Sequence, residues 1–275
     1  MNQHNIAKLW VVATPIGNLE DFSVRARSVL QCVDLIAAED TRHSGALLRH
    51  FGIATPTFAL HEHNEREACD TLVRRMHDGA QIALISDAGT PLISDPGFRL
   101  VRAAREAGIA VSPVPGACAA IAALSVAGLP SDRFVFEGFL PPKATPRRAR
   151  LQHLAAEVRT LIFYESSHRI AETIDDMVQV LGGERAAVIA RELTKLFETV
   201  LDGTLGKLAQ RVAADADQRR GEFVVVVAGA DAQADDARLI EGRRVFALLR
   251  VELPPSRAAK LAAEITGAPR KMLYE

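Results

Sequence analysis

Three loops in the N-terminal half of the chain place glycine, proline and small side chains directly after predicted strands. They comprise residues 13–19 (ATPIGNL), 86–91 (SDAGTP) and 114–119 (VPGACA). Ligands of open α/β sheets bind beyond the carboxyl ends of the strands. Asp87 can accept hydrogen bonds from an amine or a hydroxyl, and residues 114–119 lead into a helix whose free N–H groups can bind a polar ligand. Each loop alone is explained equally well as a turn, but together they predict a shared cofactor site.

Three charged segments follow other predicted strands. They are residues 39–43 (EDTRH), 164–169 (YESSHR) and 191–195 (RELTK). Loops converge at the carboxyl edge of a sheet, so these side chains are expected to point into the cleft that holds the ligand. The alternative is that the charged groups pair with one another and only fix the shape of the loops.

Several familiar sites are missing from the sequence. No GxGxxG follows the first strand and no GxxxxGK[ST] occurs, which disfavours a Rossmann dehydrogenase and a P-loop enzyme. His61, Glu62 and His63 lack a matched third ligand, so no metal site is predicted. Three widely spaced cysteines without CxxC spacing indicate a reduced, cytoplasmic setting, and no apolar run of about 18 residues predicts a membrane span.

Short apolar runs that end in turn residues alternate with segments of helical spacing, which is typical of α/β domains around a mostly parallel sheet. The first set of predicted strands covers residues 9–13, 33–37, 82–86 and 109–114, with helices at 23–31, 65–76 and 98–106. The second set covers residues 134–139, 160–164, 186–190, 200–204 and 223–228, with helices at 147–157, 168–181 and 205–215. We therefore expect two α/β domains, residues 1–118 and 119–232, divided near an Ala-rich helix between Pro115 and Pro130.

The C-terminal residues have a different pattern. Residues 231–236 (DAQADD) indicate a linker. A predicted helix at 238–251 is followed by Pro254 and Pro255, and a short helix at 256–265 ends before Gly267. This small helical unit, residues 236–275, resembles a helix-turn-helix. A plain helical tail for dimerisation or capping is the alternative.

The formal net charge of −1 means that a nucleic acid would have to be held by local basic clusters. One cluster is Lys143, Arg147, Arg148 and Arg150. The other is the surplus of arginine and lysine in the C-terminal unit. Either cluster is also explained as a solvated face.

Several short strings occur in the same order as in a known family. They are residues 13–21, 38–42 (AEDTR), 86–91, 94–97 (SDPG), 163–169 and 192–195 (ELTK). By these strings the chain resembles, over nearly its full length, the small-subunit ribosomal RNA methyltransferase I family of the tetrapyrrole-methylase superfamily. It departs from the family pattern where Ala117 and Cys118 stand in place of Pro-Ser, and where Ser167 stands in place of Pro.

The resemblance implies a homodimer with S-adenosylmethionine (SAM) in the cleft between the two α/β domains. It implies methylation of a cytidine ribose 2′-hydroxyl in small-subunit ribosomal RNA. A protein of nearly zero net charge gains little from non-specific attraction to RNA, so the assembled subunit is the expected substrate. Any side-chain contact of the family's Ser would be weakened by the thiol of Cys118, whereas a backbone contact would survive. The cofactor-binding residues carried over are Pro15, Asp87, Ala88, Gly89, Pro91, Gly116, Cys118 and Ala119.

Methyl transfer to a sugar hydroxyl requires alignment of the reactants and removal of a proton. Carboxylates and imidazole can accept the proton, whereas lysine and arginine are better suited to phosphate contacts or to stabilising negative charge on oxygen. The expected catalytic residues are Glu165, Asp40, His168 and Lys195, of which the first three are candidate bases. The expected substrate-binding residues are Arg42, Arg169, Arg147 and Arg148.

Two alternative functions have distinct signatures. A small-molecule methyltransferase that acts on a tetrapyrrole would not need the two basic clusters. A non-catalytic RNA-binding module would bind RNA independently of SAM and transfer no methyl group. The intact loops argue against the second alternative.

Overall fold

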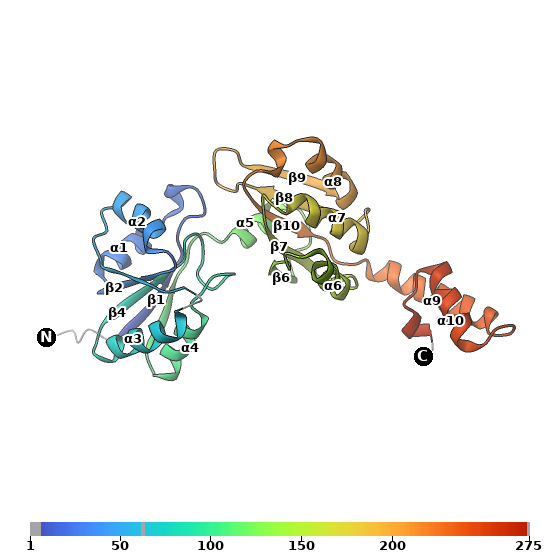
Figure 1. The fold of residues 1–275 in the computed structure, drawn as a ribbon, viewed down its shortest axis with the longest axis horizontal. Helices are drawn as coiled ribbons and strands as arrows, with labels where there is room; N and C mark the ends of the chain where they lie inside the picture. The colour runs from blue at the N-terminus through green and yellow to red at the C-terminus, as the bar shows by residue number, and fades with distance from the viewer. Residues whose placement is uncertain (1–6, 62–63, 274–275) are drawn as a thin grey trace.

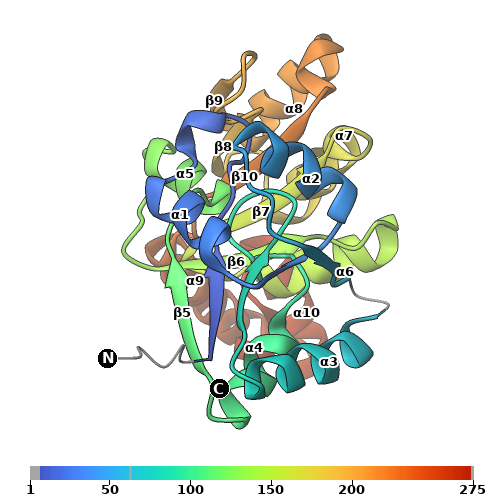
Figure 2. The same cartoon turned by 90° about the vertical axis from the view of Figure 1, so that its left-hand side faces the viewer.

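The computed structural model describes residues 7–61 and 64–273. The first α/β domain has a parallel sheet with the strand order β3-β2-β4-β1-β5. Its strands are β1 (Lys8–Val12), β2 (Leu35–Ala38), β3 (Thr57–Ala59), β4 (Gln81–Ile85) and β5 (Ala110–Val114). Helices α1 (Val24–Cys32) and α2 (Thr41–His50) cover one face, and α3 (Glu65–His77) and α4 (Phe98–Glu106) cover the other (Figures 1 and 2).

The central strands of this sheet are buried on both faces, which explains their unbroken apolar sequences. Successive side chains of a strand point to opposite faces. Leu35 and Leu84 therefore pack in the layer with α3 and α4, whereas Ile36 and Ile85 pack in the layer with α1 and α2. This double core holds the strand ends, and the loops that follow them, in a fixed position.

The second α/β domain has the strand order β6-β7-β10-β8-β9. Strand β6 (Phe134–Phe139) is parallel to β7 (Thr160–Ser166), whereas β10 (Glu222–Val227) is antiparallel to β7 and to β8 (Ala186–Arg191), which is antiparallel to β9 (Thr199–Thr204). Helices α6 (Ala144–Leu154), α7 (Ile170–Leu181) and α8 (Leu205–Ala214) pack on one face, and α5 (Ala119–Val126) packs on the other. The expectation of a mostly parallel sheet is confirmed for the first domain and wrong for the second. There β10 runs antiparallel between β7 and β8, and residues 192–198 join β8 directly to β9 as a hairpin.

A small helical unit follows the second domain and stands apart from it (Figure 1). It consists of α9 (Ala232–Leu249), α10 (Pro255–Thr266) and a last turn at Arg270–Leu273, which pack around Ala262, Ala268 and Leu273. The linker expected at residues 231–236 is wrong from Ala232 onward, because α9 begins there. Alanine favours helix and acidic residues are stabilised near a helix N-terminus, so this composition fits a first turn as well as a linker.

Two elements of the first domain were not expected, helix α2 and strand β3. The expected domain boundaries, after residues 118 and 232, stay predictions. Within the part of the chain that the structure describes, no helix is both long and apolar enough to cross a bilayer.

Candidate functional site

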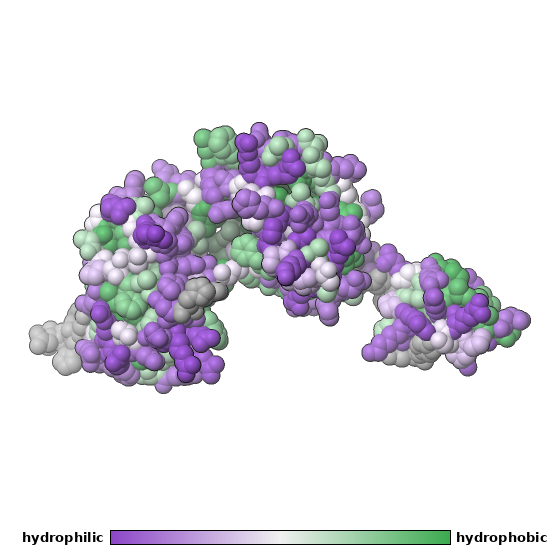
Figure 3. All heavy atoms as spheres, in the orientation of Figure 1, coloured by the Kyte–Doolittle hydropathy of each residue, from purple (hydrophilic) through white to green (hydrophobic). Residues whose placement is uncertain are grey.

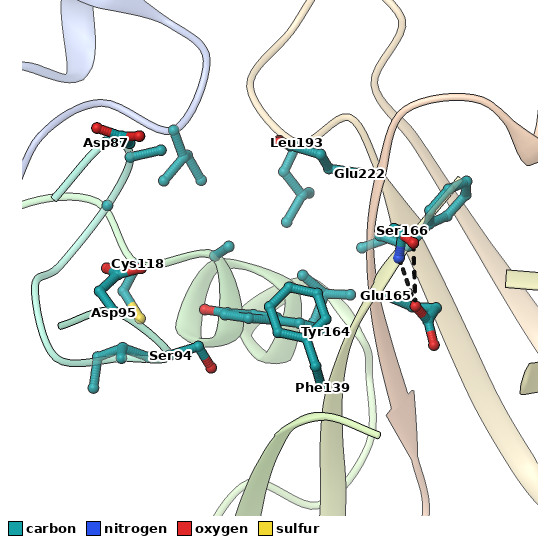
Figure 4. A pocket seen from close by; sticks show the side chains of 18 of the residues that line it. Asp87, Ser94, Asp95, Cys118, Phe139, Tyr164, Glu165, Ser166, Leu193 and Glu222 are labelled. Carbon is teal, nitrogen blue, oxygen red and sulfur yellow. Dashed lines mark hydrogen bonds between the residues drawn. The ribbon is translucent and has the colours of Figure 1, made fainter. Parts of the chain in front are cut away.

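A cleft of about 500 Å³ lies between the two α/β domains (Figures 3 and 4). The first domain contributes residues that follow β1, β2, β4 and β5, and Ala119 opens α5, which packs on the second domain. The second contributes the carboxyl ends of β6, β7 and β8 and the start of the antiparallel β10, which lies at the same edge. The described lining residues are Ile16, Glu39, Asp87, Ala88, Gly89, Thr90, Ile93, Ser94, Asp95, Cys118, Ala119, Phe139, Tyr164, Glu165, Ser166, Ser167, Ala190, Leu193, Lys195, Gly221, Glu222, Phe223 and Val224.

Hydrogen bonds join the three glycine- and proline-containing loops to one another. Thr14 and Gly89 exchange backbone hydrogen bonds of 2.9 and 3.1 Å, and the Thr90 hydroxyl donates to the Ala117 carbonyl at 2.9 Å. Gly89 has a φ of 85°, a left-handed conformation that favours glycine. The three loops therefore meet at the carboxyl edge of the first sheet, as the sequence predicted.

Not every residue carried over by the resemblance reaches the cleft. Asp87, Ala88, Gly89, Cys118 and Ala119 line it. Pro15, Pro91 and Gly116 are outside the set of described lining residues, although Pro15 and Pro91 are each next to a lining residue. At Gly116 an added Cβ would lie 2.9 Å from the Ala13 Cβ, so this glycine lets the first and third loops pack together.

Asp40 acts as a helix cap in this structure. Its carboxylate accepts hydrogen bonds from the backbone N–H groups of Arg42 (2.8 Å) and His43 (3.4 Å) at the start of α2. These bonds, led by the one from Arg42, lower the pKa of Asp40. Asp40 is not one of the described residues that line the cleft. Asp87, which accepts a hydrogen bond from the Asp40 N–H at 3.2 Å, does line it. The geometry therefore argues against Asp40 as a base, and Arg42 points to solvent with a side chain 92% exposed.

Glu165 lines the cleft, but its carboxylate is bonded within the second domain. The buried carboxylate accepts hydrogen bonds from the Ser166 N–H at 2.8 Å (Figure 4), from Arg169 Nε at 2.9 Å and from the Thr173 hydroxyl at 2.7 Å. Arg169 also donates to the Leu140 carbonyl at 3.2 Å. The pair of Glu165 and Arg169 thus fixes the turn between β7 and α7, the alternative that the sequence left open for these charged segments.

Lys195 is held at the mouth of the cleft by two carboxylates. Its Nζ donates to Glu192 Oε1 at 2.9 Å and to Glu222 Oε2 at 2.8 Å. Burial lowers the pKa of Lys195, but the hydrogen bonds to Glu222 and Glu192 outweigh burial and raise it. Lys195 is therefore a cation at neutral pH. Its loop also contacts the first domain, because the Asn18 N–H donates to the Thr194 hydroxyl at 3.1 Å.

The expectation that Arg147 binds RNA is wrong, because its side chain is buried. Arg147 is 1% exposed, and its Nε donates to Asp176 Oδ2 at 2.6 Å. Arg148 pairs with the other oxygen of Asp176 at 2.6 Å but keeps a side chain 51% exposed. His168 is exposed, and it does not belong to the described residues that line the cleft. Of these two arginines, Arg148 remains available to an RNA phosphate.

Asp95 is a site residue that sequence reasoning missed. It lines the cleft, and burial, together with the negative charges of Glu39 and Asp87, raises the pKa of Asp95 to about 6 against a smaller opposing effect of a hydrogen bond with Ser86. Its place in the string SDPG, soon after the second loop, was the signal that could have identified it.

An aromatic pair in the second domain was also missed. The Tyr164 hydroxyl accepts a hydrogen bond from the Ala120 N–H at 3.1 Å, and burial, with a smaller effect of Cys118, raises the pKa of Tyr164. The Phe139 ring lies 5.7 Å from the Tyr164 ring, edge to face, and Phe139 is 54% exposed (Figure 4). The cleft therefore has an open aromatic face, which suits a planar ligand.

Within residues 7–61 and 64–273, no group of three or more His, Cys, Asp or Glu side chains is arranged to hold a metal ion. The HEH string at 61–63 cannot be judged as a whole, because Glu62 and His63 lie outside the described residues.

Comparisons with known proteins identify two matching families. The family described as Tetrapyrrole (Corrin/Porphyrin) Methylases matches residues 8–209, and the family described as RsmI C-terminal HTH domain matches residues 236–275.

Related chains and structures agree with these matches. A Xylella fastidiosa (strain Temecula1) protein named Ribosomal RNA small subunit methyltransferase I is 64% identical over 97% of both chains. An Escherichia coli O157:H7 protein of the same name is 55% identical over 100% of this chain and 98% of that one. The X-ray structure of a cobalamin biosynthetic enzyme, cobalt precorrin-4 methyltransferase, superposes with a TM-score of 0.58 at 16% identity, over 83% of this chain and 97% of that one. This structure shows that the fold is shared.

Proposed function

The chain belongs to the family of small-subunit ribosomal RNA methyltransferases I, built on the tetrapyrrole methylase fold, and we propose that it transfers a methyl group from SAM to a cytidine ribose 2′-hydroxyl of small-subunit ribosomal RNA. The observation that carries the proposal is the interdomain cleft, where the predicted loops meet, in a chain similar over its full length to proteins of that name. The tetrapyrrole substrate is not favoured, because the cobalt precorrin-4 methyltransferase is only 16% identical to this chain, whereas the relatives named for ribosomal RNA are 55–64% identical.

The cleft fits SAM in size and in chemistry. A volume of about 500 Å³ is in the range of small-molecule sites. SAM carries an ammonium group and ribose hydroxyls, which the Asp87 carboxylate can bind, and the absence of a side chain at Gly89 allows close approach to the backbone. When bound, SAM supplies the methyl group together with a neutral thioether leaving group. We assign Asp87, Ala88, Gly89, Cys118 and Ala119 as its contacts.

The main task of the protein is to align the acceptor oxygen with the methyl carbon, an effect that can supply about 7–11 kcal/mol. An acceptor nucleotide has to be turned out of its stack to enter a cleft. The open face of Phe139 can stack on its base, and the ammonium of Lys195 can attract its phosphate. Both groups are in the second domain, so that domain positions the RNA and the first positions SAM.

The small helical unit is the second RNA contact that we propose. Its exposed basic residues include Arg243, Arg244, Arg250, Arg257, Lys260, Arg270 and Lys271. Residues 1–235 hold 25 lysines and arginines against 29 aspartates and glutamates, so the rest of the chain is net negative and a separate basic unit gains importance. This distribution supports an assembled small subunit as the substrate, with one contact at the methylated nucleotide and another at a distance.

Exposed apolar side chains support a homodimer. Leu196 and Phe197, in the hairpin between β8 and β9, are 89% and 68% exposed, and Ile121 and Val126 of α5 are 49% and 54% exposed. Large apolar patches on a surface mark protein interfaces, and we place the dimer contact at these two segments. Sedimentation velocity should show a dimer for the wild type and a monomer for a variant with Leu196→Asp and Phe197→Asp; a monomeric wild type would contradict the proposal.

The test of the proposed function is transfer of radiolabelled methyl from SAM to purified small subunits that lack the modification. Digestion to nucleosides should place the label on a cytidine 2′-oxygen. Label on tetrapyrroles and not on subunits would make the chain a small-molecule methyltransferase. RNA binding independent of SAM, with no transfer to either substrate, would make it a binding module.

A paired experiment tests the small helical unit. Deletion of residues 236–275 should weaken binding to small subunits and spare SAM binding. The double variant Arg257→Glu and Lys260→Glu changes two exposed side chains, so the unit should stay folded while subunit binding weakens in the same way. Equal loss of SAM and subunit binding, or no loss of either, would contradict this role.

A further inference from the structure

Methyl transfer to a ribose hydroxyl releases a proton, and a positioned base that accepts it can accelerate the reaction by about 10²–10⁴. The bases expected from the sequence are poorly placed for this. Asp40 caps α2, and the Glu165 carboxylate is bonded to Arg169 and Thr173. His168 is exposed and falls outside the described lining of the cleft.

Asp95 occupies a more suitable position. It lies in the segment between β4 and α4 and lines the cleft from the first domain, near Cys118 and across from Tyr164 (Figure 4). Two residues of its segment, Leu92 and Ser94, have φ values of 76° and 70°, which non-glycine residues rarely adopt. Such conformations are strained, and they cluster at functional sites. The local backbone is therefore held in a specific shape next to the cleft.

The same segment reaches the second domain. Ser94 Oγ lies so close to β6 that a Cβ added to Gly138 would be only 2.9 Å from it. Phe139, the open aromatic face of the cleft, is the next residue of β6. Asp95 is thus positioned between the loops assigned to the methyl donor and the surface assigned to the acceptor base.

The groups around Asp95 give it the basicity that the reaction needs. Burial, with the charges of Glu39 and Asp87, raises the pKa of Asp95 from its ordinary 3.8 to about 6. The other titratable groups nearby are Tyr164, whose pKa burial raises so that it stays neutral, and Cys118. A carboxylate of this kind is ionised at neutral pH and binds a proton more readily than an exposed one.

We propose that Asp95 is the general base that accepts the proton of the acceptor 2′-hydroxyl, an inference that rests on the proposed function. The hydroxyl oxygen forms a bond to the methyl carbon while the carbon–sulfur bond breaks, with its electron pair moving to sulfur. The O–H proton passes to a carboxylate oxygen of Asp95 and then to water. The step neutralises the sulfonium and the carboxylate together, so charge is conserved.

The test compares Asp95→Asn with wild type in single-turnover methyl transfer to small subunits at saturating SAM. The variant should lose at least about 100-fold in rate, while its Kd for SAM stays within about threefold. The wild-type rate should rise with pH along an acid limb with an apparent pKa at or below about 6, because the bound sulfonium favours the ionised carboxylate, and this limb should be absent from the variant. Asp202→Asn, which changes an exposed carboxylate of β9, should keep the wild-type rate and pH profile.

A second variant separates catalysis from a structural effect. Asp95→Ala should lose transfer in the same way and regain part of it when formate is added, because a small carboxylate can occupy the vacated space. The inference is overturned if Asp95→Asn transfers within about threefold of wild type with an unchanged acid limb. It is also overturned if the variant instead loses SAM binding, which would make Asp95 a cofactor ligand. Failure of the proposed function differs from both, since wild type itself would then transfer no methyl to the subunit.

Discussion

Replacement of Asp95 by Asn should make the protein more stable at neutral pH, although it is expected to impair methyl transfer. Folding raises the pKa of Asp95 from 3.8 to about 6, because the carboxylate becomes buried. One pKa unit corresponds to about 1.4 kcal/mol, so the ionised carboxylate lowers the free energy of unfolding by at most about 3 kcal/mol. Partial access of water to the cleft reduces this cost, and we expect a gain of about 1–2 kcal/mol in the variant.

The sign of the pH dependence follows from the raised pKa. The stability contributed by protonated Asp95 is fully present below pH 3.8 and is lost as the pH rises through about 6. The advantage of Asp95→Asn should therefore be small at pH 4.5 and largest at pH 7.5. Urea unfolding can be followed through Trp10, the only tryptophan, which lies in β1 of the same domain.

Asp202→Asn is the matched control, and it should show no gain that grows with pH. An Asp95→Asn protein that is no more stable than wild type at pH 7.5 would refute the reasoning. A gain of the same size at both pH values would refute it as well, since the titration of a buried carboxylate could not then be its cause.

Three further predictions concern other contacts. Arg147→Ala should lower the free energy of unfolding by about 3–5 kcal/mol in urea unfolding, because the buried Asp176 loses one of the two arginines that pair with it. A loss below about 1 kcal/mol would contradict this. Gly17→Ala should weaken SAM binding about tenfold in calorimetry, because a Cβ there would collide with the side chain of Lys195 and separate the two domains. The control variant Gly45→Ala, within α2, should bind SAM normally. Phe139→Leu should weaken subunit binding by about 1–3 kcal/mol in filter binding and spare SAM affinity; unchanged subunit binding would exclude stacking on this ring.

The sequence by itself determined the two α/β domains and the loops at the edge of the first sheet. Strands buried on both faces need unbroken apolar runs, and the turns after them need glycine or proline, so both leave local signals. Strand β3 left too weak a signal because it has three residues, and α2 carries few apolar residues. Asp40, the N-cap of α2, could have revealed the start of this helix, since Asp is favoured at that position.

Local signals say nothing about the partner that a charged side chain finds. Arg147 and Asp176 are 29 residues apart, and only the packing of α6 against α7 makes them a buried pair instead of an RNA contact. The same holds for Glu165, which sits at the expected edge of the sheet but is bonded to Arg169 and Thr173. A buried charge has to be paired, and the tertiary structure decides with which group.

The identity of the cleft residues was likewise decided by the tertiary structure. Asp95 and Phe139 belong to different domains, and they line one cavity only because the two sheets present their edges to each other. Burial in that cavity, and the nearby Glu39 and Asp87, give Asp95 its raised pKa, which the aspartate in SDPG does not have in an extended chain. Strand and turn chemistry is local and can be read from a sequence, whereas basicity depends on the dielectric and the charges that folding places around a group.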